Sequence, residues 1–402
     1  SEIGRYALLA GLLVVAYLLV LAWNDDYGDP ARGVDARAVA GDPLTDVPPA
    51  PTSAPTRDEA SDTTAADAPA DVPSIRDLEV PRRSGDAAGE RGEVEGTLVR
   101  VHTDVLNLWI DRRGGDIVKA TLPTYPVSLD TPEIPFTLLD RTQDFVYVAQ
   151  SGLAGPDGAD ASPAGRPRYE VDADLFELAS DADTLVVPLR YTDERGVTTV
   201  KRFVLRRGDH AVRVELEVRN PTAEALQVNL YGQIKRSPGM PPDQETSGLG
   251  PRPYVGAAFT TPDSRYEKVD FDDLDDEPWQ ARMDGGWLAM LQHYFLSAWV
   301  PITEAEHLYR GRRGGDGTYL VEFVGPTITV PAGQERQLAA QFYAGPKDQD
   351  RLEALAPNLS LTVDYGFLWW MAVPLLRLLD MLHGLVRKRH VAIFLLTLLL
   401  QV

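Results

Sequence analysis

The histidines are the first residues to examine for catalysis or metal binding, because imidazole ionises near neutral pH and is a common zinc ligand. The six histidines are scattered through the chain, at His102, His210, His293, His307, His383 and His390. No pair has the HExxH spacing that presents two ligands on one helix face. The chain has no cysteine, which excludes thiolate metal sites, thiol catalysis and disulfides. We therefore predict no catalytic, metal or cofactor site, and no enzyme activity.

A cluster of carboxylates is the remaining candidate for ion chemistry. Residues 270–277 (DFDDLDDE) contain six acidic side chains in eight positions. They lack the spacing of an EF-hand loop, with its central Gly and terminal Glu. We expect an acidic loop exposed to solvent. There is also no phosphate-binding loop, nucleophile elbow or dinucleotide motif, and the glycine pairs at 114–115, 285–286 and 314–315 are typical of turns.

Composition limits the class of protein. The chain has 402 residues, of which 44% are hydrophobic and 25% charged, as in a folded protein. Its net charge is −21. Because nucleic-acid binding needs a basic face that replaces phosphate counterions, we expect no nucleic-acid partner.

The first 95 residues contain an apolar and then an acidic segment. Tyr6–Trp23 is an uncharged run of 18 residues, close to the ~20 residues that cross a bilayer, and it ends in Trp rather than in the small residues of a signal-peptide cleavage site. Residues 1–23 are therefore predicted to be a transmembrane anchor. Residues 24–95 have nine Pro and seventeen acidic side chains against seven Arg, a composition typical of a disordered linker.

Alternation of apolar and polar residues dominates from there to residue 345. Val212, Val214, Leu216 and Val218 alternate with charged residues, as in a half-buried strand. Similar runs predict further strands at 98–101, 105–110, 185–191, 200–205, 226–231, 319–324 and 327–330. We assign Trp287–Trp299 to strands from its context. Many strands joined by short turns predict a large antiparallel β-sandwich over 96–345.

The C-terminal residues change to a helical pattern. Residues 346–366 are expected to be a short helix, Pro346–Ala356, and a connector. In residues 367–390 the polar residues lie on one narrow stripe of an apolar helix, and two tryptophans mark one end: Arg377, Asp380, His383 and Arg387, with Trp369 and Trp370. This pattern favours a helix lying in a membrane interface, although a helix packed on a protein core gives the same pattern. Residues 391–402 are expected to begin a second transmembrane helix, so the chain is expected to be the N-terminal part of a longer protein.

Several stretches, in this order, resemble the YidC family of membrane-protein insertases of Gram-negative bacteria. They are the anchor ending Ala22-Trp23, then 103–126 (TDVLNLWIDRRGGDIVKATLPTYP), 147–158 (YVAQSGLAGPDG), 191–220 around FVLRRGDHAV, 261–271 (TPDSRYEKVDF), 285–301 (GGWLAMLQHYFLSAWVP) and 361–369 (LTVDYGFLW). The resemblance implies a bacterial inner-membrane protein with a cytoplasmic N-terminus and a large periplasmic β-supersandwich, similar to galactose mutarotases. It also implies that 367–390 is the interfacial helix on the periplasmic face.

The resemblance further implies a function. The family inserts and folds inner-membrane proteins without nucleotide, alone or with the Sec translocon. The implied partners are nascent inner-membrane proteins, the Sec translocon with its SecD and SecF accessory proteins, and the phospholipid bilayer. A groove arginine of the family aligns with Gln401, which is uncharged.

Two other functions remain open at this point. One is a tethered periplasmic docking module that binds Sec components or peptides without insertase activity of its own. The other is a sugar epimerase, suggested by the mutarotase-like architecture. No His–Glu pair in the sequence stands out as its acid and base.

Overall fold

The computed structural model describes residues 98–128, 130–162, 165–239 and 254–363, and near the C-terminus 375, 377–379, 381–382, 384, 386 and 389–401. The predicted anchor (1–23) and linker (24–95) lie outside the described residues.

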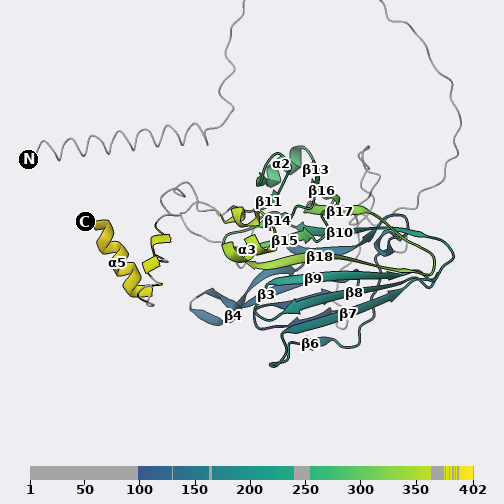
Figure 1. Cartoon of the computed structure of the whole chain (residues 1–402), viewed down its shortest axis with the longest axis horizontal. Helices are drawn as coiled ribbons and strands as arrows, with labels where there is room; N and C mark the ends of the chain where they lie inside the picture. Colours follow the sequence, from purple (N-terminus) through teal and green to yellow (C-terminus); the bar gives the residue numbers. More distant parts are fainter. Residues whose placement is uncertain are drawn as a thin grey trace, which may run out of the picture. The chain divides into compact units, whose positions relative to one another are not determined.

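Within the described residues, ten strands form one sheet, in the order β13-β16-β17-β10-β5-β4-β3-β2-β1-β6 (Figure 1). Neighbours are antiparallel except for the parallel pair β1–β6. The bounds are β1 Leu98–His102, β2 Asn107–Asp111, β3 Asp116–Ser128, β4 Thr131–Arg141, β5 Val146–Ala154, β6 Leu175–Glu177, β10 Leu226–Arg236, β13 Trp279–Asp284, β16 Glu306–Arg313 and β17 Tyr319–Val330.

A second, antiparallel sheet of eight described strands has the order β12-β11-β14-β15-β18-β9-β8-β7. The bounds are β7 Thr184–Thr192, β8 Thr198–Arg206, β9 Ala211–Arg219, β11 Gly256–Phe259, β12 Glu267–Val269, β14 Leu288–Leu291, β15 Phe295–Pro301 and β18 Glu335–Pro346. The assignment of Trp287–Trp299 to strands is confirmed by β14 and β15.

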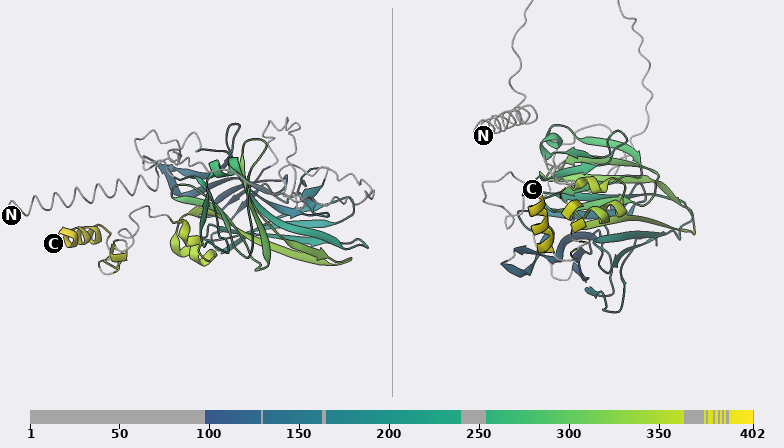
Figure 2. Two further views of the ribbon diagram at one scale, coloured as in Figure 1. Left: turned by 90° about the horizontal axis from the view of Figure 1, so that it is seen from above. Right: turned by 60° about the vertical axis from the view of Figure 1, so that its left-hand side comes forward.

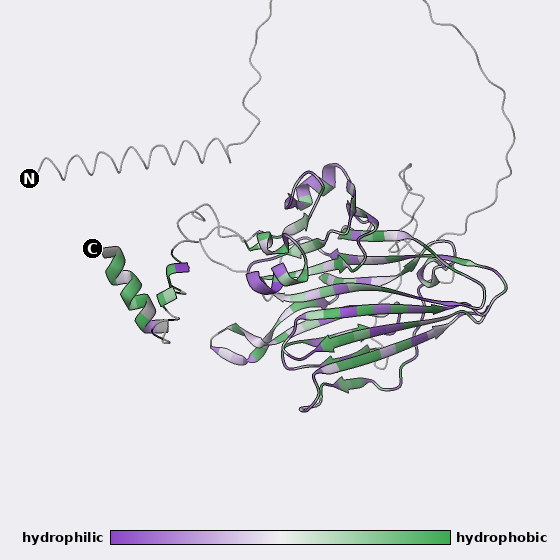
Figure 3. Ribbon diagram, in the orientation of Figure 1, coloured by the Kyte–Doolittle hydropathy of each residue, from purple (hydrophilic) through white to green (hydrophobic). Residues whose placement is uncertain are grey.

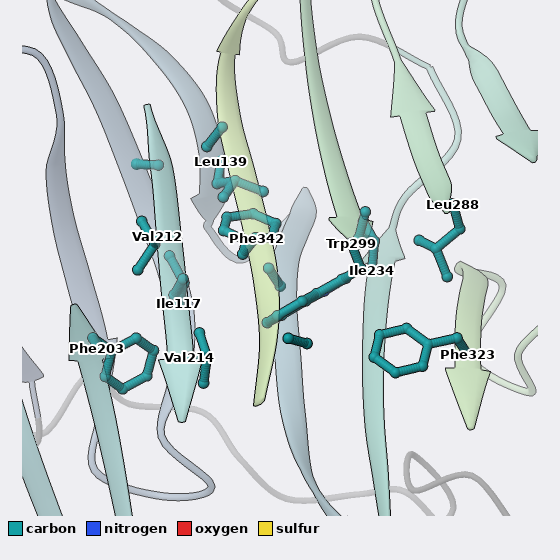
Figure 4. Packing of buried hydrophobic residues seen from close by; sticks show 14 of the residues in the cluster. Ile117, Leu139, Phe203, Val212, Val214, Ile234, Leu288, Trp299, Phe323 and Phe342 are labelled. Atoms are coloured by element: carbon teal, nitrogen blue, oxygen red, sulfur yellow. The ribbon is translucent and has the colours of Figure 1, made fainter. Parts of the chain in front are cut away.

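The main hydrophobic core lies between the two sheets. In β9, Val212, Val214, Leu216 and Val218 are all buried, as their alternation predicts. They share the core with side chains from the other sheet, such as Ile234 in β10. Figure 4 shows Ile234 and Trp299 among the core residues that fill this layer from both sheets. The chain therefore forms a mainly β, two-sheet sandwich.

A second apolar cluster covers the outer face of the eight-stranded sheet. Helix α3 (Gln349–Leu355) begins at Asp348, whose side chain accepts a hydrogen bond from the Arg351 amide and so caps the helix. Leu352 of α3 and Leu359 of the 3₁₀ helix η3 (Leu359–Thr362) are buried against Trp287 and its neighbours. The predicted helix at 346–356 is confirmed. Figure 2 shows these short helices outside the sandwich.

Two local expectations were wrong. The acidic segment 270–277 is not a loop: Phe271–Asp276 form helix α2, because Asp270 and Asp273 make a reciprocal capping box and Leu274 is buried. The strands expected at 319–324 and 327–330 are one strand, β17. A register shift opposite β10 accommodates the Gly325-Pro326 step without ending the strand.

Strand β7 is an edge of the eight-stranded sheet. Arg190 uses its outward amide and carbonyl to pair with Glu170, at 2.9 and 2.7 Å. Pro188 is two residues away and therefore presents its backbone to the same open edge. Since proline has no amide hydrogen, this edge lacks one of the donors that an added strand would need.

Candidate functional site

The predicted interfacial helix is only partly described. Arg377 is helical and exposed, as a residue of a polar stripe would be. Trp369, Trp370, Asp380, His383 and Arg387 lie outside the described residues. The geometry that the sequence predicts for this stripe stays a prediction.

Gln401 is the last residue of helix α5 (Arg389–Gln401). This helix is apolar along most of its length, as the green ribbon in Figure 3 shows, and it exposes Phe394 and Leu399 to 66% and 57%. Its Thr397 hydroxyl donates to the Ile393 carbonyl at 2.8 Å. Because this bond satisfies the one polar side chain within residues 391–400, the outside of that stretch is suited to an apolar environment. No helix among the described residues is both long enough and apolar enough to cross a membrane.

A row of polar side chains crosses the outer face of the ten-stranded sheet. Gln150 of β5 is paired with Gln233 of β10, Gln233 with Glu322 of β17, and Glu322 with Arg310 of β16. The amide nitrogen of Gln233 donates to the Gln150 side-chain oxygen at 2.7 Å. The Glu322 carboxylate is fully buried and lies 3.8 Å from the guanidinium groups of both Arg310 and Arg312.

This row leads into a buried charge cluster, which we define as Asp116, Asp160, Arg166 and Lys201. The Gln150 amide donates to the Asp116 carboxylate at 2.8 Å. Arg166 pairs with Asp116 and, at 2.9 Å, with Asp160. Asp160 belongs to the 3₁₀ helix η1 (Ala159–Ala161) and also accepts the Leu153 amide at 2.8 Å. The cluster holds two cations and two anions, so their charges balance inside the protein.

Lys201 enters the cluster from the opposite sheet. Its ammonium group donates to the carbonyl oxygens of Gly114 at 3.0 Å and Ser151 at 2.8 Å. A Cβ atom at Gly115, whose φ is +64°, would lie 2.9 Å from the Lys201 side chain, so the glycine turn makes room for the lysine. Burial lowers the pKa of Lys201 to about 8 against the opposing effect of Asp116 and Asp160. Burial likewise raises the pKa of Asp116, opposed by Arg166.

Two buried tyrosines lie beside the charge cluster. The hydroxyl groups of Tyr169 and Tyr231 are buried and have no hydrogen-bond partner within the described residues. Burial raises the pKa of both well above the usual value. All the charged side chains around them are paired within the protein, so the cluster joins the two sheets rather than presenting a charge to a ligand.

Two His–Glu combinations bear on sugar chemistry: His102 and Glu177 lie 3.6 Å apart with largely exposed side chains, whereas the buried Glu322 and His307 are separated by the sheet. Glu322 points to the outer face, whereas His307 shares the core-facing side with Tyr309 and Phe323, 5.8 Å from the Phe323 ring. Burial lowers the pKa of His307. Groups on opposite faces of a sheet cannot act on the same atoms as acid and base. In the described part of the chain, no three His, Asp or Glu residues are grouped to hold a metal ion.

An exposed apolar surface lies at the end of the sandwich where α3 begins. The β3–β4 hairpin projects at this end (Figures 1 and 2), and its Phe136 ring stacks on Phe295 with centroids 4.3 Å apart. We define the tip surface as Val127, Ile134 and Tyr294, which are 43%, 49% and 71% exposed. Tyr294 has φ +68°, a strained value for a tyrosine.

Sequence analysis missed the buried charge cluster, but one signal was present. Lys201 shares the face of its predicted strand with Phe203 and Leu205, which are core residues. A lysine on a core-facing position must find acceptors inside the protein.

The chain resembles known proteins along its whole length. The family model of the YidC periplasmic domain matches residues 98–378. A relative from Azotobacter vinelandii, called membrane protein insertase YidC, is 40% identical over 404 residues, covering 100% of this chain and 68% of the relative. One of the same name from Pseudomonas putida is 39% identical over 400 residues, with the same coverage.

Solved structures give weaker matches. A galactose mutarotase related enzyme from Lactobacillus acidophilus has a TM-score of 0.40 and 10% identity, covering 61% of this chain and 97% of that one. A putative aldose 1-epimerase from Escherichia coli K12 has a TM-score of 0.39 and 12% identity, covering 62% and 99%.

Proposed function

Because the chain belongs to the YidC family of membrane protein insertases, we propose that it contributes the anchor and the periplasmic domain of an insertase for inner-membrane proteins. The supporting observation is identity of about 40% along the whole chain to proteins of that name. These relatives are insertases, and not enzymes that make or break covalent bonds in a substrate. The buried charge cluster, whose acidic and basic side chains are paired with one another, agrees with a domain that binds and positions rather than catalyses.

In the proposed layout, one membrane segment precedes the sandwich in the sequence and another follows it. Residues 1–23 form the anchor with a cytoplasmic N-terminus, 24–95 the linker, and 367–390 the helix in the periplasmic interface. Residues 391–402 begin the second transmembrane helix. The apolar outside of α5 supports this layout, since exposed Phe394 and Leu399 are costly in water and favourable in lipid.

The experiment is depletion of the protein in its host, followed by pulse-labelling of small inner-membrane proteins. We expect these substrates to become accessible to protease or to remain uninserted, and re-expression of the complete protein to restore insertion. Unchanged insertion after depletion would exclude insertase function. Retention of the protein in alkali-washed membranes tests the anchor separately.

Partnership with the Sec translocon and its SecD and SecF proteins is a second part of the proposal. The outer face of β8, β9 and β18 supports it, because paired charges form a patterned surface there. The Arg202 guanidinium lies 2.8 Å from Glu217, and Arg219 contacts both Glu217 and Glu335 at 2.7 and 3.2 Å. Charge patterns of this kind give specificity to protein contacts. A photocrosslinking residue at Arg213 on this face should capture a Sec component in living cells, and one at buried Val214 should not.

The docking module without insertase activity makes a different prediction. If the protein only docks Sec components, replacing residues 98–346 with a flexible linker should abolish its contribution to growth. If it is an insertase, the shortened protein should keep part of its insertion activity.

A further inference from the structure

The tip surface defined by Val127, Ile134 and Tyr294 has no role in the contacts described so far. It combines residues from two separate hairpins, β3–β4 and β14–β15. Tyr125 and Phe136 of the first hairpin both pack on Phe295 of the second, with centroids 5.5 and 4.3 Å away. The two hairpins are therefore fixed to each other, and their exposed residues form one surface rather than separate mobile loops.

The β3–β4 hairpin is built to be stiff. Pro126 and Pro135 face each other across it, and the hairpin also contains Pro123 and Pro132. Proline fixes φ and removes the amide donors that another strand would need. An exposed apolar hairpin of this composition is poorly suited to pairing with a peptide as an additional strand. It is better suited to holding its exposed side chains in fixed positions relative to the sandwich.

Tyr294 is held at the same end by the backbone between β18 and α3. The Lys347 amide donates to the Tyr294 carbonyl at 2.9 Å, and the Tyr294 ring lies 3.8 Å from that of His293. Burial and the nearby Lys347 charge lower the pKa of His293, so the lysine is the cation at this position. A tyrosine beside a cation matches the apolar and phosphate layers of a membrane interface.

The chain itself indicates what this end faces. Its described part continues from α3 to Val363, and only 25 residues separate Val363 from Arg389, where the apolar helix α5 begins. In the proposed layout, residues 367–390 lie in the interface and α5 enters the bilayer. The proposed interfacial helix begins shortly after Val363, so the layout tethers this end of the sandwich next to the lipid surface.

We propose that the tip surface rests on the phospholipid bilayer, with Val127, Ile134 and Tyr294 in its headgroup layer. This inference rests on the proposed function, because it needs a sandwich tethered next to a membrane. The exposed Asp130 and Glu133 at the hairpin tip remain in water, which limits the contact to the interface rather than the hydrocarbon core. The contact would set the height of the periplasmic domain above the membrane.

Residues 1–402 contain no cysteine, so an introduced cysteine is the single labelling site within them and allows a direct test. Ile134→Cys and Tyr294→Cys are each labelled with a nitroxide in the complete protein, reconstituted into vesicles of phosphatidylethanolamine and phosphatidylglycerol. Val186→Cys is the matched control, because Val186 is 45% exposed and lies on β7 at the open edge. We expect the ratio of oxygen to nickel-complex accessibility at 134 and 294 to exceed that at 186 by roughly twofold or more, since apolar oxygen enters lipid and the polar complex does not.

Equal ratios at the three positions would overturn the inference. Shielding of 134 and 294 from both reagents that appears only after Sec components are added would also overturn it, because the surface would then bind a protein. These failures are distinct from failure of the proposed function, which is measured in the same vesicles by insertion of a substrate. A protein that inserts substrate while its tip labels stay in water refutes the lipid contact alone.

Discussion

The Nζ atom of Lys201 lies 2.8 Å from the carbonyl oxygen of Ser151 and so connects β8 of one sheet to β5 of the other. The lysine crosses the interior of the sandwich to make this bond. Its charge is compensated by Asp116 and Asp160, which Arg166 also contacts. The two sheets are therefore joined by a polar link as well as by the apolar core.

Lys201 should give the protein an unusual dependence on alkaline pH. The folded protein releases the Lys201 proton near pH 8, whereas the unfolded chain holds it to about 10.5. Between these values the unfolded state binds more protons, so the free energy of unfolding rises with pH, by about 2 kcal/mol from pH 8 to pH 10. Denaturant titrations of the wild type and of Lys201→Met measure the difference. The variant should be less stable at pH 7 and should lack this rise; parallel curves would contradict the assignment.

Removing Arg166 should destabilise the fold far more than removing an exposed arginine. Arg166→Met leaves Asp116 and Asp160 buried with Lys201 as their remaining cation, which we expect to cost about 3 kcal/mol or more. Arg219→Met is the control, because Arg219 is 59% exposed and pairs at the surface, where a pair is worth about 1 kcal/mol or less. Equal losses in chemical denaturation would mean that the cluster is not a structural link.

Asp316 should contribute to stability loss in acid. Although burial opposes it, hydrogen bonds from Thr318 and Lys235 lower the pKa of Asp316 to about 2. Its contribution is complete above pH 4 and is lost as the pH falls from about 4 to about 2. Because the side chain is 44% exposed, we expect a contribution of at most about 1 kcal/mol. Unfolding of Asp316→Asn should lack this component between pH 4 and pH 2, and an unchanged acid profile would refute it.

Relief of backbone strain at Tyr294 should stabilise the protein. Tyr294→Gly removes a left-handed φ from a residue that disfavours it, with an expected gain of about 1 kcal/mol in the free energy of unfolding. Asn358→Gly is the control at φ +66°, where asparagine is tolerated and the gain should be small. A loss of stability in Tyr294→Gly would show that contacts of the ring outweigh the strain.

Gln401 should affect insertion of substrates that carry polar residues. If it occupies the family's groove position, Gln401→Leu removes a hydrogen-bonding group worth on the order of 1 kcal/mol and should reduce their insertion several-fold. Gln401→Arg should retain or increase it. Protease protection of a labelled substrate measures the effect, with Thr397→Val as control because that hydroxyl bonds within α5. Equal insertion by the wild type and Gln401→Leu would remove Gln401 from the groove.

Periodicity in the sequence is sufficient to predict much of the sandwich. The alternation through Val212–Val218 identifies β9 and its buried face, because a period of two assigns sides without knowledge of the partner strand. The acidic helix α2 was not predicted, since its apolar signal is Phe271 and Leu274 alone and its carboxylates suggest a loop. The continuity of β17 through Pro326 depends on a register shift opposite β10, which sequence does not display.

The polar features depend on pairing between distant strands. Gln150, Gln233 and Glu322 form a row only through the registers of β5, β10 and β17. Similarly, Arg166 meets Asp116 across 50 positions. Local patterns identify each strand, but they do not say which residues face one another, so the row and the charge cluster required the structure.

Pro188 and the Arg190–Glu170 bridge have a consequence for a protein that works among incompletely folded clients. An unprotected sheet margin would act as a template on which extended client segments, or further copies of the sandwich, could accumulate. Pro188 has no amide donor, and the backbone of Arg190 is already paired with Glu170. The β7 margin therefore offers such segments no continuous row of hydrogen-bonding groups. The domain can thus remain near aggregation-prone chains and stay a discrete, reusable unit.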